Sequence, residues 1–150
     1  MMKSKRFEPI HEIASTSAKD LSRAMGEAAR KVADLERQFE QLQSYRDEYV
    51  RNSQSPAAID AVKLQNYRSF LDRLGDALRQ HLKNLDTARA EYERRRALWS
   101  EKRIEAESLS RVVDRFRKEE QHAADRREQH DGDEAAMRMA LAAVAGTGNH

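Results

Sequence analysis

One stretch decides the fold, residues 57–100: AAIDAVKLQNYRSFLDRLGDALRQHLKNLDTARAEYERRRALWS, and its pattern continues to Leu141. Core positions recur at alternating steps of three and four residues, without a skip and with no proline inside. They include Leu64, Tyr67, Leu71, Leu74 and Leu78. A heptad repeat of this kind packs one narrow stripe of a helix against a partner helix in a left-handed supercoil. The stretch therefore predicts one long helix that requires a partner.

A second heptad repeat, which precedes the first, can supply that partner. One series of its core positions is Phe7, Ala14, Leu21, Ala28, Leu35, Leu42 and Tyr49. Pro9 suits the first turn of a helix, and the polar run 51–56 is the break between the two repeats. Asn52 can close a helix, while Ser55 and Pro56 suit the cap and first residue of the next one. A short polar link between two such helices predicts an antiparallel hairpin.

We therefore expect an all-α fold, a two-helix antiparallel coiled-coil hairpin whose second helix is longer and projects. Residues 1–8 are predicted to form a basic amino-terminal arm, and residues 9–141 the hairpin, with its turn at about 51–56. Residues 142–150, rich in alanine and ending in glycine-containing sequence, are predicted to form a flexible tail.

Two registers of the hairpin fit the repeats. The first pairs Leu35 with Leu71, Leu21 with Leu85, and Phe7 with Trp99. The second slides by one heptad and pairs Ala28 with Leu85, Met25 with Ala88, and Ala14 with Trp99. The second is favoured slightly because it sets small residues opposite large ones. In either register the first helix ends near residues 100–106 of the second, which leaves Leu109, Val113 and Phe116 uncovered as a possible docking segment for another protein.

Composition argues against a compact globule. Charged residues make up 36% of the 150 residues, and the net charge of +2 comes from interleaved basic and acidic side chains. Interleaved charges are typical of a solvated helix surface and do not favour nucleic-acid binding. The chain has no cysteine, no signal-peptide pattern at its start and no apolar run long enough to span a membrane. We expect a soluble, cytoplasmic protein.

The sequence carries no recognisable catalytic or metal-binding motif. His11 and His81 lie at core positions, where a polar residue more often fixes register than binds a metal. His122 and His130 are eight residues apart rather than four, and the acids near His130 suit an exposed surface. We predict no enzymatic activity, no cofactor, no metal and no small-molecule substrate.

Two stripes of side chains stand out beside the predicted turn, one on each helix. Both follow the spacing i, i+4, i+7, i+11, and each adds two residues at the flanking g position of the heptad. The stripes are Gln38, Leu42, Tyr45 and Tyr49, and Phe70, Leu74, Ala77 and His81. They indicate either a locally wider core or an exposed aromatic patch that binds a protein partner.

Several segments resemble the FliJ family of flagellar type III export proteins. They are YRDEY (45–49), LQNYRSFL (64–71), RALW (96–99), and REQ (127–129) followed by DE (133–134). Their order and spacing, the heptads and the turn placement extend the resemblance over about residues 7–137. Beyond Arg138 the resemblance fades.

The resemblance implies a stalk-like, non-enzymatic coiled coil of the export apparatus. It implies three partners: the flagellar export ATPase ring, the cytoplasmic domain of the export-gate membrane protein, and the export chaperones. It places the gate contact on the two stripes, and the ATPase contact toward the paired termini without assigning residues. It also implies a cytoplasmic location, at the inner membrane only through these partners.

Two other functions remain open. One is a generic structural coiled coil that dimerises through its carboxy-terminal core positions. The other is a basic coiled coil that binds nucleic acid.

Overall fold

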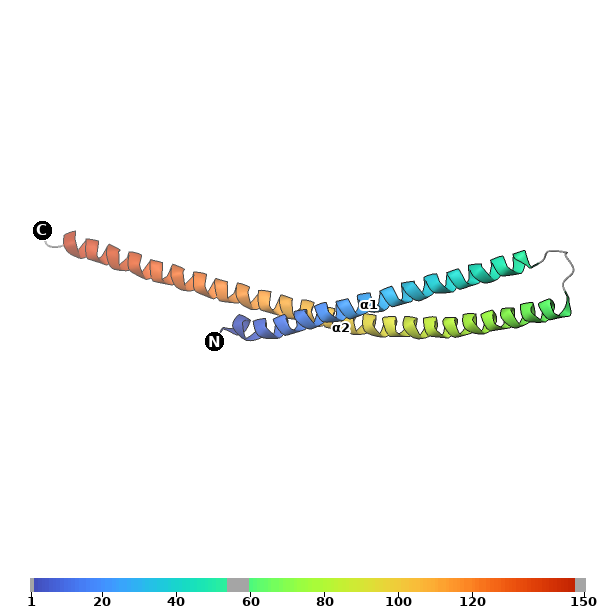
Figure 1. Cartoon of the computed structure of the whole chain (residues 1–150). Coiled ribbons are helices and arrows are strands. Elements are labelled where there is room, and N and C mark those ends of the chain that lie inside the picture. Colours follow the sequence, from blue (N-terminus) through green and yellow to red (C-terminus); the bar gives the residue numbers. More distant parts are fainter. Residues whose placement is uncertain (1, 54–59, 148–150) are drawn as a thin grey trace. The chain divides into compact units, whose positions relative to one another are not determined.

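The fold consists of two long α-helices, as Figure 1 shows for the computed structural model, which describes residues 2–53 and 60–147. Helix α1 spans Lys3–Asn52 and helix α2 spans Ala61–Thr147, with 50 and 87 residues. The helices pack against each other as a hairpin, and the second is the longer. The predicted all-α fold is therefore confirmed.

The chain divides into two compact units, and each contains a part of both helices. One unit is Ser17–Lys102, and the other joins Met1–Thr16 to Arg103–His150. We call them the central unit and the terminal unit. The structure describes residues 60–102 and 17–53 of the central unit, and residues 2–16 and 103–147 of the terminal unit.

Each unit has a thin core made from the predicted heptad positions. The buried apolar residues of the central unit are Ala28, Leu74, Leu78, Leu85 and Ala88. Those of the terminal unit are Ala14, Ala106 and Val113. Burying a leucine side chain stabilises a fold by about 1.5–3 kcal/mol, so these few residues carry much of the packing energy.

The helix register differs from both predicted alternatives. The favoured register would place Phe39 opposite Leu74, whereas in the structure the Phe39 ring stacks on His81, one heptad further along α2, with ring centroids 6.3 Å apart. Helix α1 ends at Asn52 and α2 begins at Ala61, whereas the turn was predicted at about 51–56.

The start of α2 is also later than predicted. Asp60 caps it: its Oδ1 accepts a hydrogen bond from the Lys63 backbone N–H at 2.8 Å, and its carbonyl accepts one from the Leu64 N–H at 3.0 Å. A side-chain acceptor at this place satisfies one of the free N–H groups of the first turn. The predicted cap, Ser55 with Pro56, lies outside the described residues.

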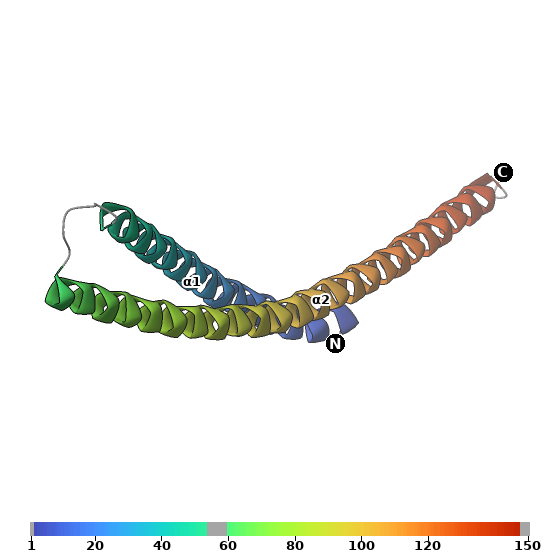
Figure 2. The ribbon, with the colours of Figure 1, turned by 90° about the vertical axis from the view of Figure 1, so that its right-hand side faces the viewer.

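The prediction that residues 109–116 are uncovered is wrong. In the terminal unit the Phe7 ring lies 5.4 Å from the Phe116 ring, Leu109 is half-buried, and Val113 is only 4% exposed. Both views place the first turns of α1 beside α2 (Figures 1 and 2). Two differences cause this: the shifted register, and the helical conformation of residues 3–8, which were expected to form an arm. The bare part of α2 begins only after Glu120, where every described residue except Ala123 is exposed.

Pro9 lies inside α1 and not at its start. A proline in a helix interior costs about 3 kcal/mol, because it removes a backbone hydrogen bond and crowds the preceding turn. The turns before it are held by tertiary contacts: the Phe7–Phe116 ring contact, and two hydrogen bonds that Arg117 donates to Glu8. At the other end of the chain, α2 continues to Thr147, so residues 142–147 are helical where a tail was predicted.

Glu120 of α2 caps the amino terminus of α1. Its Oε1 accepts a hydrogen bond from the Ser4 backbone N–H at 3.1 Å, and its Oε2 accepts one from the Ser4 hydroxyl at 2.6 Å. These two bonds, the hydroxyl one first, lower the pKa of Glu120 below its ordinary value of 4.5. A negative charge at this place also interacts favourably with the helix dipole. The contact therefore ties the first turn of α1 to one position on α2.

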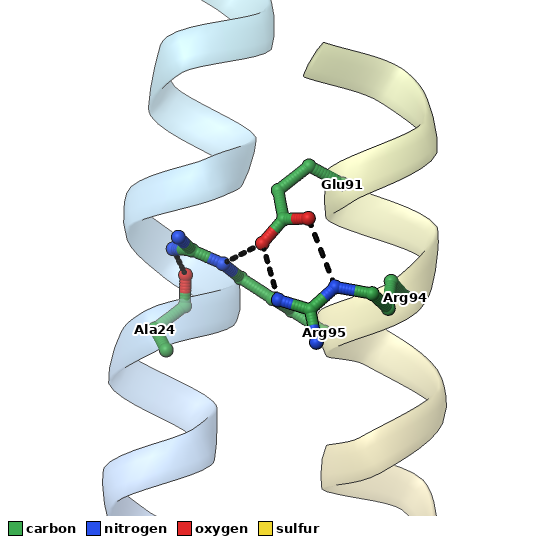
Figure 3. A network of polar contacts seen from close by, with 4 residues as sticks. All are labelled: Ala24, Glu91, Arg94 and Arg95. Atoms are coloured by element: carbon green, nitrogen blue, oxygen red, sulfur yellow. Dashed lines mark hydrogen bonds and ion pairs between the residues drawn. The ribbon is translucent and has the colours of Figure 1, made fainter. Parts of the chain in front are cut away.

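Polar side chains at core positions of the central unit bond to the main chain of α1. Arg95 Nη1 donates to the Ala24 carbonyl at 2.9 Å, and His81 Nε2 lies 3.0 Å from the Leu35 carbonyl. Figure 3 shows that Glu91 accepts hydrogen bonds from both Arg94 and Arg95. These bonds, that of Arg94 first, lower the pKa of Glu91 to about 2. Glu91 thus orients the Arg95 guanidinium toward α1.

We predict that Leu85→Ala lowers the free energy of unfolding by about 2–5 kcal/mol, because Leu85 is only 3% exposed and its removal leaves a cavity. Urea denaturation followed by circular dichroism at 222 nm measures this. The control is Leu82→Ala on the same helix, where the side chain is 41% exposed and the expected loss is below about 1 kcal/mol. Equal losses in the two variants would contradict the observed packing.

We also predict that the first turn of α1 melts as the pH falls, because its cap must be ionised. Because the pKa of Glu120 is lowered in the folded state, the ionised carboxylate stabilises this turn fully above about pH 4.5. That stabilisation is lost as the pH falls through the lower folded-state pKa. The Cα secondary chemical shifts of residues 3–7 report this loss by NMR. Glu120→Gln should show weakened helical shifts already at pH 6, whereas Glu119→Gln, beside it and exposed, should behave as the unmodified chain. Unchanged shifts in Glu120→Gln would show that the cap does not hold this turn.

Candidate functional site

Four aromatic rings form a row across the two helices of the central unit, near the link. Tyr45 and Tyr49 belong to the last two turns of α1, and Tyr67 and Phe70 belong to the first turns of α2. The ring centroids of Tyr49 and Tyr67 lie 5.4 Å apart, those of Tyr49 and Phe70 lie 4.4 Å apart, and those of Tyr45 and Phe70 lie 6.3 Å apart. We call these four residues the ring row.

The spacing of the rings along each helix produces this arrangement. Tyr45 and Tyr49 are four residues apart and Tyr67 and Phe70 are three apart, so each pair lies on one helix face. Because the helices are antiparallel, the two faces meet and the rings alternate between α1 and α2. The Tyr49–Tyr67 pair is stacked and the Tyr45–Phe70 pair meets edge to face, which are the two arrangements that aromatic rings prefer.

The structure brings the two predicted stripes together, but their eight residues differ in exposure. Tyr45 is 52% exposed, and Gln38 and Ala77 are also exposed. Leu42, Tyr49, Phe70 and His81 are half-buried. Leu74 is 8% exposed and belongs to the core, so it supports the surface without forming it. The patch is therefore both a wider core and an exposed aromatic surface.

His81 lies further from the link and is held firmly. Its ring stacks on Phe39 at an interplanar angle of 15°, and its Nε2 lies 3.0 Å from the Leu35 carbonyl. Because a carbonyl only accepts, Nε2 must carry the proton, which leaves Nδ1 as the acceptor in the neutral ring. A partner can therefore donate a hydrogen bond to His81 without disturbing its contact with α1.

Two residues of this region were missed as site residues from the sequence. Tyr67 was assigned to the core because it occupies a heptad core position, yet its ring completes the row beside Tyr49. Phe39 supports His81 in the same way. The available signal was an aromatic side chain at a core position within one turn of each stripe.

The segment of Leu109, Val113 and Phe116 is a different case. These residues belong to the paired part of the terminal unit, where Phe116 also has the Lys3 ammonium 5.5 Å and the Arg115 guanidinium 5.9 Å from its ring centroid. Their predicted docking role rested on exposure, which they lack.

Within residues 2–53 and 60–147 no group of acids and histidines could hold a metal ion. A groove of the central unit is lined by apolar residues, Ala28, Leu35 and Ala88, and by charged residues that include Glu91 and Arg95. Glu27 and Lys31 also line it, and Glu91 and Arg95 form an ion pair with each other. No described helix is both long and apolar enough to cross a membrane.

Known proteins are similar to this chain over most of its length. The family model described as "Flagellar FliJ protein" matches residues 2–144. The flagellar FliJ protein of Escherichia coli (strain K12) is 27% identical over 134 residues, which cover 88% of this chain and 91% of that protein. The flagellar FliJ protein of Salmonella typhi is 26% identical over 137 residues, which cover 90% of this chain and 93% of that protein. No solved structure matches the chain significantly.

The family match extends beyond the central unit into both helices of the terminal unit, and it agrees with the resemblance noted in the motifs at residues 45–49 and 64–71. The chain therefore belongs to the FliJ family of flagellar proteins, which are non-enzymatic components of the flagellar export apparatus.

Proposed function

We propose that this chain is a stalk-like coiled coil that engages the flagellar export ATPase ring and links it to the export gate and the export chaperones. The family membership supports the setting, and the ring row supports the contact with the gate. In this proposal the protein is cytoplasmic and reaches the inner membrane only through its partners.

The main support for a gate contact is the exposed ring of Tyr45 on α1, which packs against the ring of Phe70 on α2. Exposed tyrosine rings on a charged surface are frequent anchors of protein interfaces, because they bury a large area while losing little conformational entropy. Gln38, Ala77 and His81 extend the same surface with smaller or polar groups. We propose that the cytoplasmic domain of the gate protein binds this surface.

The ATPase contact is proposed for the terminal unit, which contains the start of α1 and the end of α2. The resemblance supports this end without assigning residues to it. The terminal unit and the ring row have no residue in common, so one partner need not displace the other from its contact residues. Coupling between the two partners would require both contacts in one complex.

The two alternative functions have less support. Dimerisation through residues 109–116 required these residues to be uncovered, whereas α1 packs against them. Nucleic-acid binding is disfavoured because many arginines pair with an acid three residues earlier in the same helix. These pairs are Asp20–Arg23, Asp34–Arg37, Asp76–Arg79, Glu91–Arg94 and Glu93–Arg96.

We predict that Tyr45→Ala weakens binding to the gate cytoplasmic domain at least about tenfold, or about 1.4 kcal/mol, because it removes an exposed interface anchor. Titration calorimetry with the purified domain measures the dissociation constant. Helicity should stay unchanged, since Tyr45 makes one ring contact and is 52% exposed.

The matched control for this experiment is Val62→Ala, an exposed apolar residue at the same end of α2 that is 68% exposed and takes no part in the ring row. It should bind the gate domain within about twofold of the unmodified chain. Both variants should still retain the export ATPase in a pull-down. The proposed gate contact is wrong if Tyr45→Ala binds the domain as tightly as Val62→Ala does.

A further inference from the structure

Tyr49 lies between two rings of α2, and only one of them belongs to the predicted stripes. On one side is Phe70, with ring centroids 4.4 Å apart, and on the other is Tyr67, at 5.4 Å and an interplanar angle of 17°. Tyr67 and Phe70 lie three residues apart on α2, so both rings face α1. The Tyr49 ring is therefore fixed from two sides.

Phe70 in turn contacts two rings of α1. Besides Tyr49 it meets Tyr45 edge to face, at 6.3 Å and 78°. In the part of the chain that the structure describes, Phe70 is the only ring against Tyr45. The position of the exposed ring of Tyr45 therefore depends on Phe70, and the position of Phe70 depends on how firmly Tyr49 is held.

Tyr67 is the half-buried end of this row, and Tyr45 is the exposed end. The hydroxyl of Tyr67 makes no hydrogen bond to another described residue, so its ring alone accounts for its contact with Tyr49. The contacts that the described residues make within the row are ring contacts. Its order is set by ring packing between helices, close to the end of α1 at Asn52 and the start of α2 at Ala61.

We propose that Tyr67 is a positioning residue for the gate contact: it holds Tyr49 against Phe70 and thereby fixes the Tyr45 ring, without touching the gate protein itself. This inference rests on the proposed function, because it assigns the support of the same surface. The proposal also assigns different roles to the residues of the patch. Tyr45 is a contact residue, whereas Tyr49 and Tyr67 act through other side chains.

The test compares Tyr67→Ala and Tyr67→Phe in the full-length chain. Calorimetry with the gate cytoplasmic domain should show about five- to tenfold weaker binding for Tyr67→Ala, and binding within about twofold of the unmodified chain for Tyr67→Phe. The phenylalanine variant restores the ring without the hydroxyl. If it binds as weakly as Tyr67→Ala, the hydroxyl itself is needed and the proposal is overturned.

The matched control is Tyr92→Ala, which removes another half-buried tyrosine of α2 that lies at a core position and outside the ring row. It should weaken the hairpin to a similar extent in urea but leave gate binding near that of the unmodified chain. A loss of gate binding equal to that of Tyr67→Ala would mean that general stability is responsible, and would overturn the assignment.

A second measurement tests the ring contacts of the row in the free protein, without any partner. In the NMR spectrum of the free protein, Tyr67→Ala should shift the ring resonances of Tyr45 while the Cα shifts of residues 40–48 stay helical. Tyr92→Ala should leave the Tyr45 resonances in place. Unmoved Tyr45 resonances in Tyr67→Ala would show that the row does not transmit the position of Tyr67.

The outcomes separate this inference from the proposed function. If the unmodified chain binds the gate domain and Tyr67→Ala binds it equally well, the positioning role is overturned and the proposed function stands. If the unmodified chain does not bind the gate domain at all, the proposed function is overturned, and the role of Tyr67 in gate binding with it.

Discussion

The narrow apolar stripe shared by α1 and α2 is the constraint on which the rest of the structure depends. Among the described residues, the eight buried apolar ones, in both units, all occupy heptad core positions. Two helices can bury only what lies between them, so this core is a single layer of side chains. No large side chain in the described residues is fully enclosed. Such a fold offers surfaces for binding and little interior in which to shift a pKa or exclude water, as expected of a non-enzymatic component of a larger apparatus.

Local periodicity was enough to predict two helices, their antiparallel packing and the greater length of the second. It could not determine the register, because a heptad repeat matches itself again after every seventh residue. Matching small residues to large ones favoured the wrong shift. Contacts such as Ser4–Glu120 and Phe7–Phe116 select the observed one. Neither contact was predicted from the sequence, because Pro9 indicated a helix start and so placed Ser4 in an arm, and because Phe7 was paired with Trp99 in one of the two registers.

Polar residues at core positions illustrate a second limit of pattern reading. The sequence placed His81 in the core and suggested that it fixes the register. In the structure its Nε2 is within hydrogen-bond distance of the Leu35 carbonyl on α1. Arg95 bonds in the same way to the Ala24 carbonyl. Main-chain acceptors occur at every residue, so no side-chain pattern on α1 marks them. The acid that orients Arg95, Glu91, lies one turn earlier on the same helix and is visible in the sequence only as a charged residue.

The candidate site shows why a surface patch and its support are hard to separate from sequence alone. Spacing identified both stripes correctly as neighbours, since Tyr45 and Tyr49 do meet Phe70. Spacing could not tell which members face solvent, because exposure depends on the rotation of each helix and on the ring opposite. Leu74 and Tyr45 belong to the same pattern, yet one is 8% and the other 52% exposed. In this thin core the exposed ring of Tyr45 packs directly against Phe70, a half-buried residue of the other helix. The proposed recognition by this surface would therefore depend on the pairing of the helices as much as on the side chains that a partner touches.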